Sequence, residues 1–355
     1  MATRDATWAY RNRFHESFAR TYFRRFADGL VSSIGVGTYL GDPTGAVDER
    51  YHDALVEAFE SGINVVDTAI NYRCQRSERV VGRAIEDADV DREELLVATK
   101  GGFVPFDGSR PADPGAYVRE EYGDYEFVRG NCLHAEYIDD QFDRSLGNLD
   151  LDTIDLYYLH NPETQLEAHS RERVYELLES AFETLERRVA ADELRHYGVA
   201  TWNAFRVPET ADDHLSIPEV VRRARAAADT VGNPSTSFRA IQLPFNVHMA
   251  DAFTTAAHDG PEGTQSALWF AQEAGIDVFT SASILQGDLA DGLPEAVAAK
   301  LEGDTAAQRA INFARSAPGV TCALVGMSSP EHVAENVAAG TFPPLGADAF
   351  DAVFE

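Results

Sequence analysis

Short runs of strand-forming residues alternate with longer amphipathic segments along almost the whole chain. Strands are expected at 33–38, 63–67, 95–100, 154–160, 196–201, 240–243, 276–280 and 322–325. Segments with helical periodicity separate them, at 49–60, 77–85 (with Ser77 as its N-cap), 137–149, 174–189, 222–229, 264–274, 305–315 and 330–338. This alternation predicts an α/β protein with a single (β/α)8 TIM barrel. The alternative is an open doubly wound sheet, but no Gly-x-Gly-x-x-Gly turn follows an early strand.

Two stretches fall outside this alternation. Residues 1–30 are charged and aromatic without a clean period, so we expect an N-terminal extension that forms a lid or brace over the barrel floor, followed by the barrel at 31–355. Residues 103–131 are rich in Gly, Pro and Tyr. A loop of this length within a compact domain is usually functional or disordered. Its aromatic side chains favour an ordered wall over the active site.

Three successive strands end on ionisable residues. Asp67, Lys100 and His160 close the second, third and fourth strands, and Tyr72 follows in the loop after the second. In a (β/α)8 barrel, ionisable residues at the carboxyl ends of strands indicate a catalytic site. A buried carboxylate also needs a cationic partner, and Lys100 is one of only two lysines in the chain. We therefore expect these side chains to meet at one rim.

The four residues, together with the tract Ser77-Glu78-Arg79-Val80-Val81-Gly82, resemble the aldo-keto reductases over about residues 35–339. The resemblance implies a barrel that interconverts a carbonyl and an alcohol with a nicotinamide cofactor. Tyr72 would be the general acid, Lys100 would lower the pKa of the phenol toward working pH, Asp67 would hold Lys100, and neutral His160 would orient the substrate oxygen. Taken one at a time, the four residues have structural explanations, such as an ion pair or a loop aromatic.

The resemblance also implies a cofactor site with NADP, and NAD as the alternative. Neither Gly326 nor His332 supplies the usual Lys or Arg for a 2′-phosphate, and Glu331 would repel it. Ala200 stands where the family has a serine, and no aromatic residue follows the seventh strand. The predicted cofactor-binding residues are Gly37, Thr38, Asp67, Thr201, Gln242, Ser283, Leu285, Gly287, Gly326, Ser328, His332, Glu335 and Asn336. Ser283, Leu285 and Gly287 would bind pyrophosphate through backbone N–H groups.

The substrate is expected to be a small aldehyde, ketone or sugar. The residues predicted to line its pocket are Tyr39, Phe103, His160, Asn161 and Trp202, which suit a sugar face or an apolar carbonyl equally.

The amino-acid composition limits the binding partners of the protein and indicates the environment in which it works. The formal net charge of −29 argues against nucleic acid and anionic membranes as partners. Because the acidic residues are spread along the chain and lysine is almost absent, we expect a halophilic protein; an ordinary acidic cytosolic enzyme is the alternative. The three cysteines lack metal-ligand spacing, which indicates a reducing cytoplasm and no metal site.

Three other functions stay open. Lys100 could be the nucleophile of a Schiff-base lyase, although a neighbouring Asp67 would keep its amine protonated. The chain could be a cofactor-binding regulatory subunit with little turnover, as the channel-associated relatives of this family are. A non-catalytic interaction barrel is the third alternative, and the departures at Ala200 and Ala282 keep the last two possibilities open.

Overall fold

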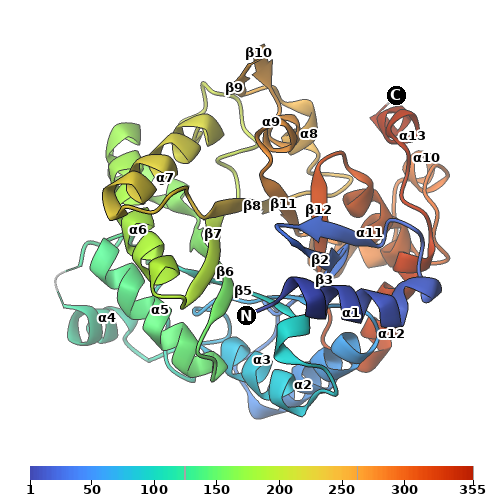
Figure 1. The fold of residues 1–355 in the computed structure, drawn as a ribbon, viewed down its shortest axis with the longest axis horizontal. Coiled ribbons are helices and arrows are strands. Elements are labelled where there is room, and N and C mark those ends of the chain that lie inside the picture. The colour runs from blue at the N-terminus through green and yellow to red at the C-terminus, as the bar shows by residue number, and fades with distance from the viewer. Residues whose placement is uncertain (124, 262, 355) are drawn as a thin grey trace.

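The centre of the molecule is a closed barrel of eight parallel strands, seen end-on in Figure 1. The computed structural model describes residues 1–123, 125–261 and 263–354. Around the barrel the strands are β3 (Ile34–Gly37), β4 (Val65–Asp67), β5 (Leu96–Gly101), β6 (Ile154–His160), β7 (Leu194–Ala200), β8 (Phe238–Pro244), β11 (Asp277–Ser281) and β12 (Val320–Gly326). Pairing of β12 with β3 closes the ring. The (β/α)8 barrel that the sequence predicts is confirmed.

Helices surround the barrel, because alternate strand residues such as Val66 and Val97 point outward and need apolar cover. The surrounding helices are α2 (Gly45–Glu60), α3 (Arg76–Asp87), α5 (Ala135–Leu149), α6 (Arg171–Ala190), α7 (Ile217–Val231), α9 (Ala267–Ala274), α11 (Ala306–Ser316) and α12 (Pro330–Ala338). Short helices α8 (Asp251–Thr254), α10 (Glu295–Ala298) and α13 (Ala347–Asp351) lie between or after them. Within the described ranges, no helix is long and apolar enough to span a membrane.

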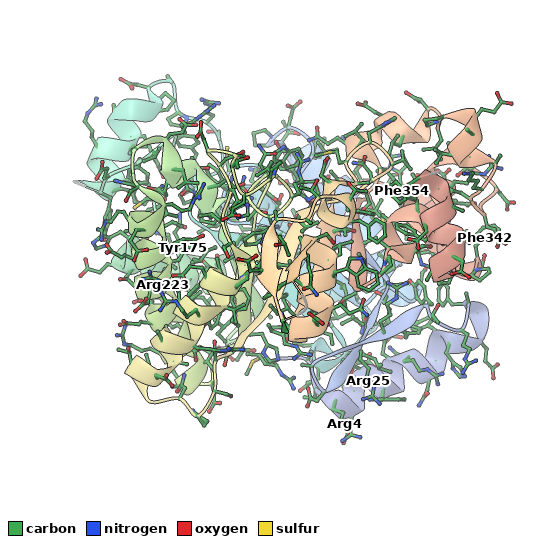
Figure 2. All side chains as sticks on the ribbon, turned by 90° about the horizontal axis from the view of Figure 1, so that it is seen from above. Arg4, Arg25, Tyr175, Arg223, Phe342 and Phe354 are labelled. Carbon is green, nitrogen blue, oxygen red and sulfur yellow. The ribbon has the colours of Figure 1, made fainter. Side chains whose placement is uncertain are left out.

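Ion pairs join the outer helices where their apolar stripes end. Arg223 of α7 lies beside Tyr175 of α6 on the flank of the molecule (Figure 2). Its guanidinium contacts the carboxylates of Glu172 and Glu179 at 2.5 and 3.0 Å, and that of Glu219 at 2.7 Å. One arginine therefore pairs with three carboxylates and offsets part of the repulsion on a strongly acidic surface.

The N-terminal residues close the barrel at the amino ends of its strands. Helix α1 (Arg4–Phe14) precedes a hairpin of β1 (Phe23–Phe26) and β2 (Gly29–Ser32). Phe26 enters the barrel interior, where its ring centroid lies 5.6 Å from that of Phe279. The backbone N–H of Ala2 donates to buried Asp155 at 2.5 Å, which ties the first residues to β6. This segment therefore lies at the end of the barrel opposite to His160.

Three local predictions were wrong. The stretch 103–131 is not all loop, because α4 (Pro114–Tyr122) begins there with Asp113 as its N-cap. The helix expected from residue 264 begins at Ala267, because β10 (Gly263–Gln265) pairs with β9 (His258–Gly260). Ser77 lies inside α3, where its hydroxyl donates to the carbonyl of Thr38 at 2.9 Å. In each case a tertiary or capping contact overrode periodicity.

A strained turn connects Tyr72 to α3. Three consecutive residues, Arg73, Cys74 and Gln75, have positive φ values of 48°, 59° and 67°. Left-handed backbone costs about 1–2 kcal/mol for each residue that carries a Cβ. The turn therefore needs tertiary contacts that hold it in place, and it fixes the position of the Tyr72 side chain just before it.

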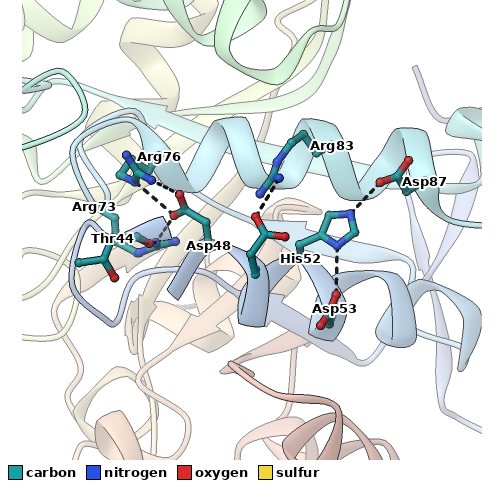
Figure 3. A network of polar contacts seen from close by, with 9 residues as sticks. Thr44, Asp48, His52, Asp53, Arg73, Arg76, Arg83 and Asp87 are labelled. Carbon is teal, nitrogen blue, oxygen red and sulfur yellow. Dashed lines mark hydrogen bonds and ion pairs between the residues drawn. The ribbon is translucent and has the colours of Figure 1, made fainter. Parts of the chain in front are cut away.

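Asp48 of α2 supplies the main contact to this turn. Its carboxylate accepts hydrogen bonds from Arg73 and Arg76, as Figure 3 shows. The side chain of Arg73 is 1% exposed, so its charge depends on Asp48 for compensation. Arg73 also donates to the carbonyl of Asp42 at 3.3 Å, and the amide of Gln75 donates to Pro105 at 3.2 Å.

Replacing Asp48 by alanine should lower the free energy of unfolding by about 3 kcal/mol, because it leaves a buried guanidinium without its counterion. Asp53→Ala is the matched control on the same helix: that carboxylate is 67% exposed and pairs with His52 among the described residues, so its loss should cost less than about 1 kcal/mol. Urea unfolding at constant salt measures both. Equal destabilisation by the two substitutions would show that Asp48 does not support the turn.

Candidate active site

The carboxyl ends of the strands surround a cavity of about 790 Å³. Asp67 is the last residue of β4, Lys100 is the next-to-last of β5, and His160 is the last of β6. The strand register places Gly37 opposite Asp67 and Ala200 opposite both His160 and Gln242. The barrel therefore brings to one rim residues that lie more than 200 positions apart in the sequence.

Asp67, Lys100 and Tyr72 are in direct contact. The Nζ atom of Lys100 lies 2.5 Å from Oδ2 of Asp67, 2.8 Å from the carbonyl oxygen of Thr68, and 3.3 Å from the hydroxyl of Tyr72. Lys100 is fully buried, because Leu96, Ala98 and Lys100 all point into the barrel. Its ammonium group therefore has three oxygen partners and no exposure to solvent.

Burial and charge act in opposite directions on these groups. Burial lowers the pKa of Lys100, but the charges and hydrogen bonds of Asp67 and Tyr72 together outweigh it, so that the ammonium pKa is raised. Burial raises the pKa of Asp67, although the charge and the hydrogen bond of Lys100 act to lower it. For Tyr72, burial outweighs the charge of Lys100, and the phenol pKa is raised above its ordinary value of 10.0. Lys100 does lower this pKa, as expected, but burial has the larger effect, so the expected net shift toward neutrality does not occur in the protein alone.

His160 faces the same cavity in its neutral form. Burial, reinforced by the charge of Lys100, lowers its pKa well below the ordinary value of 6.5. The His160 ring centroid lies 5.9 Å from that of Tyr72 and 5.1 Å from that of Phe103. Its Nδ1 atom is buried and has no hydrogen-bond partner in the described chain. One ring nitrogen of a neutral imidazole can donate a hydrogen bond to a ligand oxygen.

Gln242 and Thr201 line the cavity next to Asp67. The amide nitrogen of Gln242 donates to Oδ1 of Asp67 at 2.7 Å, so this side chain orients the carboxylate. The hydroxyl of Thr201 is buried and lacks a partner among the described residues. A buried hydroxyl without a partner at a cavity wall indicates a ligand contact.

The cavity contains nearly all of the residues that the sequence predicts for cofactor and substrate. Those that line it are Gly37, Thr38, Tyr39, Asp67, Tyr72, Phe103, His160, Asn161, Thr201, Trp202, Gln242, Ser283, Gly287, Gly326, Ser328, His332, Glu335 and Asn336. Leu285 lies outside the lining, and its backbone N–H donates to Ala282 at 2.8 Å. The N–H of Gly287 donates to Ile284 at 3.0 Å. Two of the three backbone donors expected to bind pyrophosphate there are therefore engaged within a local turn.

Arg50 and Asn71 are among the cavity residues that sequence reasoning missed. Arg50 comes from α2, which packs against α12, and in the described chain its guanidinium has no ion-pair partner. Asn71 precedes Tyr72, and its Oδ1 atom is buried without a partner among the described residues. Adjacency to Tyr72 was a usable signal for Asn71. Nothing in the sequence marked Arg50, because its position depends on how two distant helices pack.

A second cavity of about 940 Å³ opens beside the first. Phe103, Asn161 and Trp202 line both cavities. The rest of its wall is mostly polar: Arg129, Glu163, Thr164, Leu166, Glu167, His169, Arg171, Asn203, Asp212 and Asp213. A ligand bound near His160 therefore has room to extend past Trp202 into polar surroundings.

Comparisons with known proteins agree with this geometry. The family model described as "Aldo/keto reductase family" matches residues 33–225. A relative named NADH-specific methylglyoxal reductase, from Escherichia coli, is 32% identical over 138 residues, a match that spans 38% of this chain and 39% of that protein. A candidate voltage-gated potassium channel subunit beta from Schizosaccharomyces pombe is 24% identical over 324 residues, covering 88% of this chain and 85% of that one.

Among solved structures, an aldo/keto reductase from Klebsiella pneumoniae, in complex with NADP and acetate, superposes with a TM-score of 0.61 at 20% identity. The match covers 94% of each chain and shows the same fold. The family model matches more than half of the 355 residues and includes β4, β5 and β6, whose ends carry Asp67, Lys100 and His160. The chain therefore belongs to the aldo/keto reductase family.

Proposed function

We propose that this protein is an NAD(P)H-dependent oxidoreductase that interconverts a small carbonyl compound and its alcohol, with Tyr72 as the general acid and base. The observation that carries the proposal is the chain of contacts from Asp67 through Lys100 to Tyr72, with 3.3 Å between the ammonium and the phenol. Tyr72 and neutral His160 face one cavity from neighbouring loops and strands. In this proposal Tyr72 supplies a proton, and His160 a second hydrogen bond, to the carbonyl oxygen.

The cavity fits a dinucleotide cofactor. Thr201, Asn71 and His160 each present a buried polar atom without a partner in the described chain, and ligand atoms can satisfy such groups. Ser328 lines the cavity directly before α12, and the amino end of a helix is a favourable place for phosphate. A reduced nicotinamide bound here would supply the hydride.

Tyr72 provides the proton in this proposal. Its raised pKa keeps the phenol protonated at neutral pH, so that it starts the reduction in the donating form. Once the proton leaves, the ammonium of Lys100 stabilises the phenolate across 3.3 Å, and Asp67 prevents Lys100 from losing its own proton. The same pairing argues against the Schiff-base lyase, because a nucleophilic lysine must be neutral.

Our proposal for the preferred cofactor is NADP. Arg50 and His332 both line the cavity near α12, and a guanidinium without an ion-pair partner in the described chain can bind a phosphate. The Klebsiella pneumoniae structure contains NADP. The Escherichia coli relative is named NADH-specific, so NAD is the alternative.

For the substrate we propose an aldehyde, ketone or sugar. The aromatic rings of Tyr39, Phe103 and Trp202 surround the reacting position, and the polar second cavity offers hydrogen-bonding groups to the rest of the molecule. A regulatory subunit with little turnover is the second candidate, because the match to the potassium channel subunit beta spans most of both chains.

Tyr72→Phe should lower kcat/KM for carbonyl reduction by about 10²- to 10⁴-fold, because it removes the proton donor. It should leave NADPH binding unchanged, since the ring remains. NADPH oxidation at high salt against a panel of aldehydes, ketones and sugars measures turnover, and nucleotide fluorescence measures binding. Tyr39→Phe is the control: its ring centroid lies 5.0 Å from that of Tyr72, but its hydroxyl does not contact Lys100.

Full turnover by Tyr72→Phe would refute the role of Tyr72 as the general acid. Tight NADPH binding by the unmodified protein without turnover of any substrate in the panel would instead favour the regulatory subunit.

Arg50→Gln should weaken NADPH binding by about tenfold and leave NADH binding unchanged, because only NADPH carries the 2′-phosphate. Arg83→Gln is the matched control, since Arg83 pairs with Glu49 and does not line the cavity. Equilibrium dissociation constants for both nucleotides decide the result. An equal loss for NADPH and NADH would show that Arg50 does not recognise the 2′-phosphate.

A further inference from the structure

Glu163 is a buried carboxylate that the proposed reaction does not use. It follows His160 by three residues and lies in the short 3₁₀ segment Pro162–Glu167, at the wall of the second cavity. Only 9% of its surface is exposed. Burying a carboxylate is costly, so a buried one that pairs with no cation calls for a structural or functional explanation.

The carboxylate is bound by the loop that follows β7. Oε1 of Glu163 accepts hydrogen bonds from the backbone N–H groups of Trp202, at 2.6 Å, and Asn203, at 3.2 Å. Oε2 has no partner in the described part of the chain. Trp202 lines both cavities and follows Thr201 directly. Glu163 therefore fixes the backbone at the point where the cofactor side of the site meets the substrate side.

The charged groups around Glu163 do not neutralise it. Arg129 pairs with Glu167 at 2.7 Å, and Arg171 donates to the carbonyl of Ala211 at 3.0 Å. Asp213 repels the Glu163 carboxylate from the facing loop, and His169 and Asp212 complete the titratable groups of this cavity. Burial raises the pKa of Glu163 to about 7, although the backbone N–H groups of Trp202, Asn203 and Glu163 itself favour the ionised form.

We propose that Glu163 is a positioning residue: its ionised carboxylate holds Trp202 and Asn203 in place, and its protonation loosens this wall of the substrate cavity. The physical reason is that a hydrogen bond to a carboxylate is roughly twice as strong as one to a neutral oxygen. The consequence for substrate affinity rests on the function proposed above. The effect on Trp202 itself does not.

Three of the four proposed catalytic side chains cannot produce the same pH dependence. The pKa of His160 lies well below neutrality, whereas those of Tyr72 and Lys100 are raised. None of the three therefore changes charge around neutral pH in the protein alone. A transition near pH 7 that involves Trp202 consequently points to Glu163, once His169 has been excluded by substitution.

Trp202 offers a readout that needs no turnover. The chain has three tryptophans, and Trp8 and Trp269 are 38% and 45% exposed, so that Trp8→Phe with Trp269→Phe leaves Trp202 as the single emitter. In this background, we expect Trp202 emission to change with a midpoint near pH 7. Glu163→Gln should abolish the transition, because glutamine does not titrate, and His169→Gln should retain it.

In steady-state kinetics at saturating NADPH, the KM for the carbonyl substrate should rise by about three- to tenfold as the pH falls through 7, with kcat nearly constant. Glu163→Gln should hold the higher KM at every pH. Because the pKa of Glu163 rises on folding from 4.5 to about 7, ionisation costs folding free energy over that pH range. The glutamine variant should therefore unfold at an equal or higher urea concentration at about pH 8.

A Trp202 transition that survives Glu163→Gln, or that disappears with His169→Gln, would overturn the proposal. The proposal would also be overturned if KM depended on pH in Glu163→Gln in the same way as in the unmodified protein. If no substrate is turned over at all, the proposed function fails, but the Trp202 titration still decides the role of Glu163.

Discussion

The ammonium group of Lys100 is fully buried at the carboxyl end of β5, and removing such a charge from water is costly. Asp67, at 2.5 Å, makes this position tolerable, and the amide of Gln242 holds Asp67 from the other side. The same charge lies 3.3 Å from the hydroxyl of Tyr72. One ion pair is thus a structural element of the barrel and, in the proposed reaction, the positive charge that stabilises the phenolate of Tyr72.

The two ends of the barrel differ in how well their residues are packed and hydrogen-bonded. At the amino ends of the strands, the segment 1–32 fills the interior with Phe26 and Val31 and ties Ala2 to Asp155. At the carboxyl ends, the structure retains strain and unpartnered polar atoms, in the left-handed turn at 73–75 and at Thr201, Asn71 and His160. The well-packed amino ends of the strands thus stabilise a protein whose site, at the carboxyl ends, contains backbone strain and polar atoms without partners among the described residues.

The sequence determined the barrel and the residues of its centre. Eight strand-like runs separated by helical periods admitted few architectures, and a strand-end Asp, Lys and His in a barrel must share a rim, because parallel strands all point the same way. For this reason a shared rim for Asp67, Lys100 and His160 followed from their positions in the sequence, and the family resemblance added Tyr72 and the roles of the four residues. Tyr39, Phe103 and Trp202 were placed at the cavity by the same logic.

Tertiary structure decided everything that depends on how separate segments meet. Whether burial or the charge of Lys100 dominates the pKa of Tyr72 depends on how deeply the phenol is buried. Burial dominates, so the net shift of this pKa is opposite to the expected direction. Arg50 entered the cavity only because α2 packs beside α12, and Glu163 binds Trp202 across two loops. A sequence fixes which groups are available and which face of a strand they occupy. Desolvation and long-range hydrogen bonds depend on distances between distant residues, and local sequence patterns do not encode those distances.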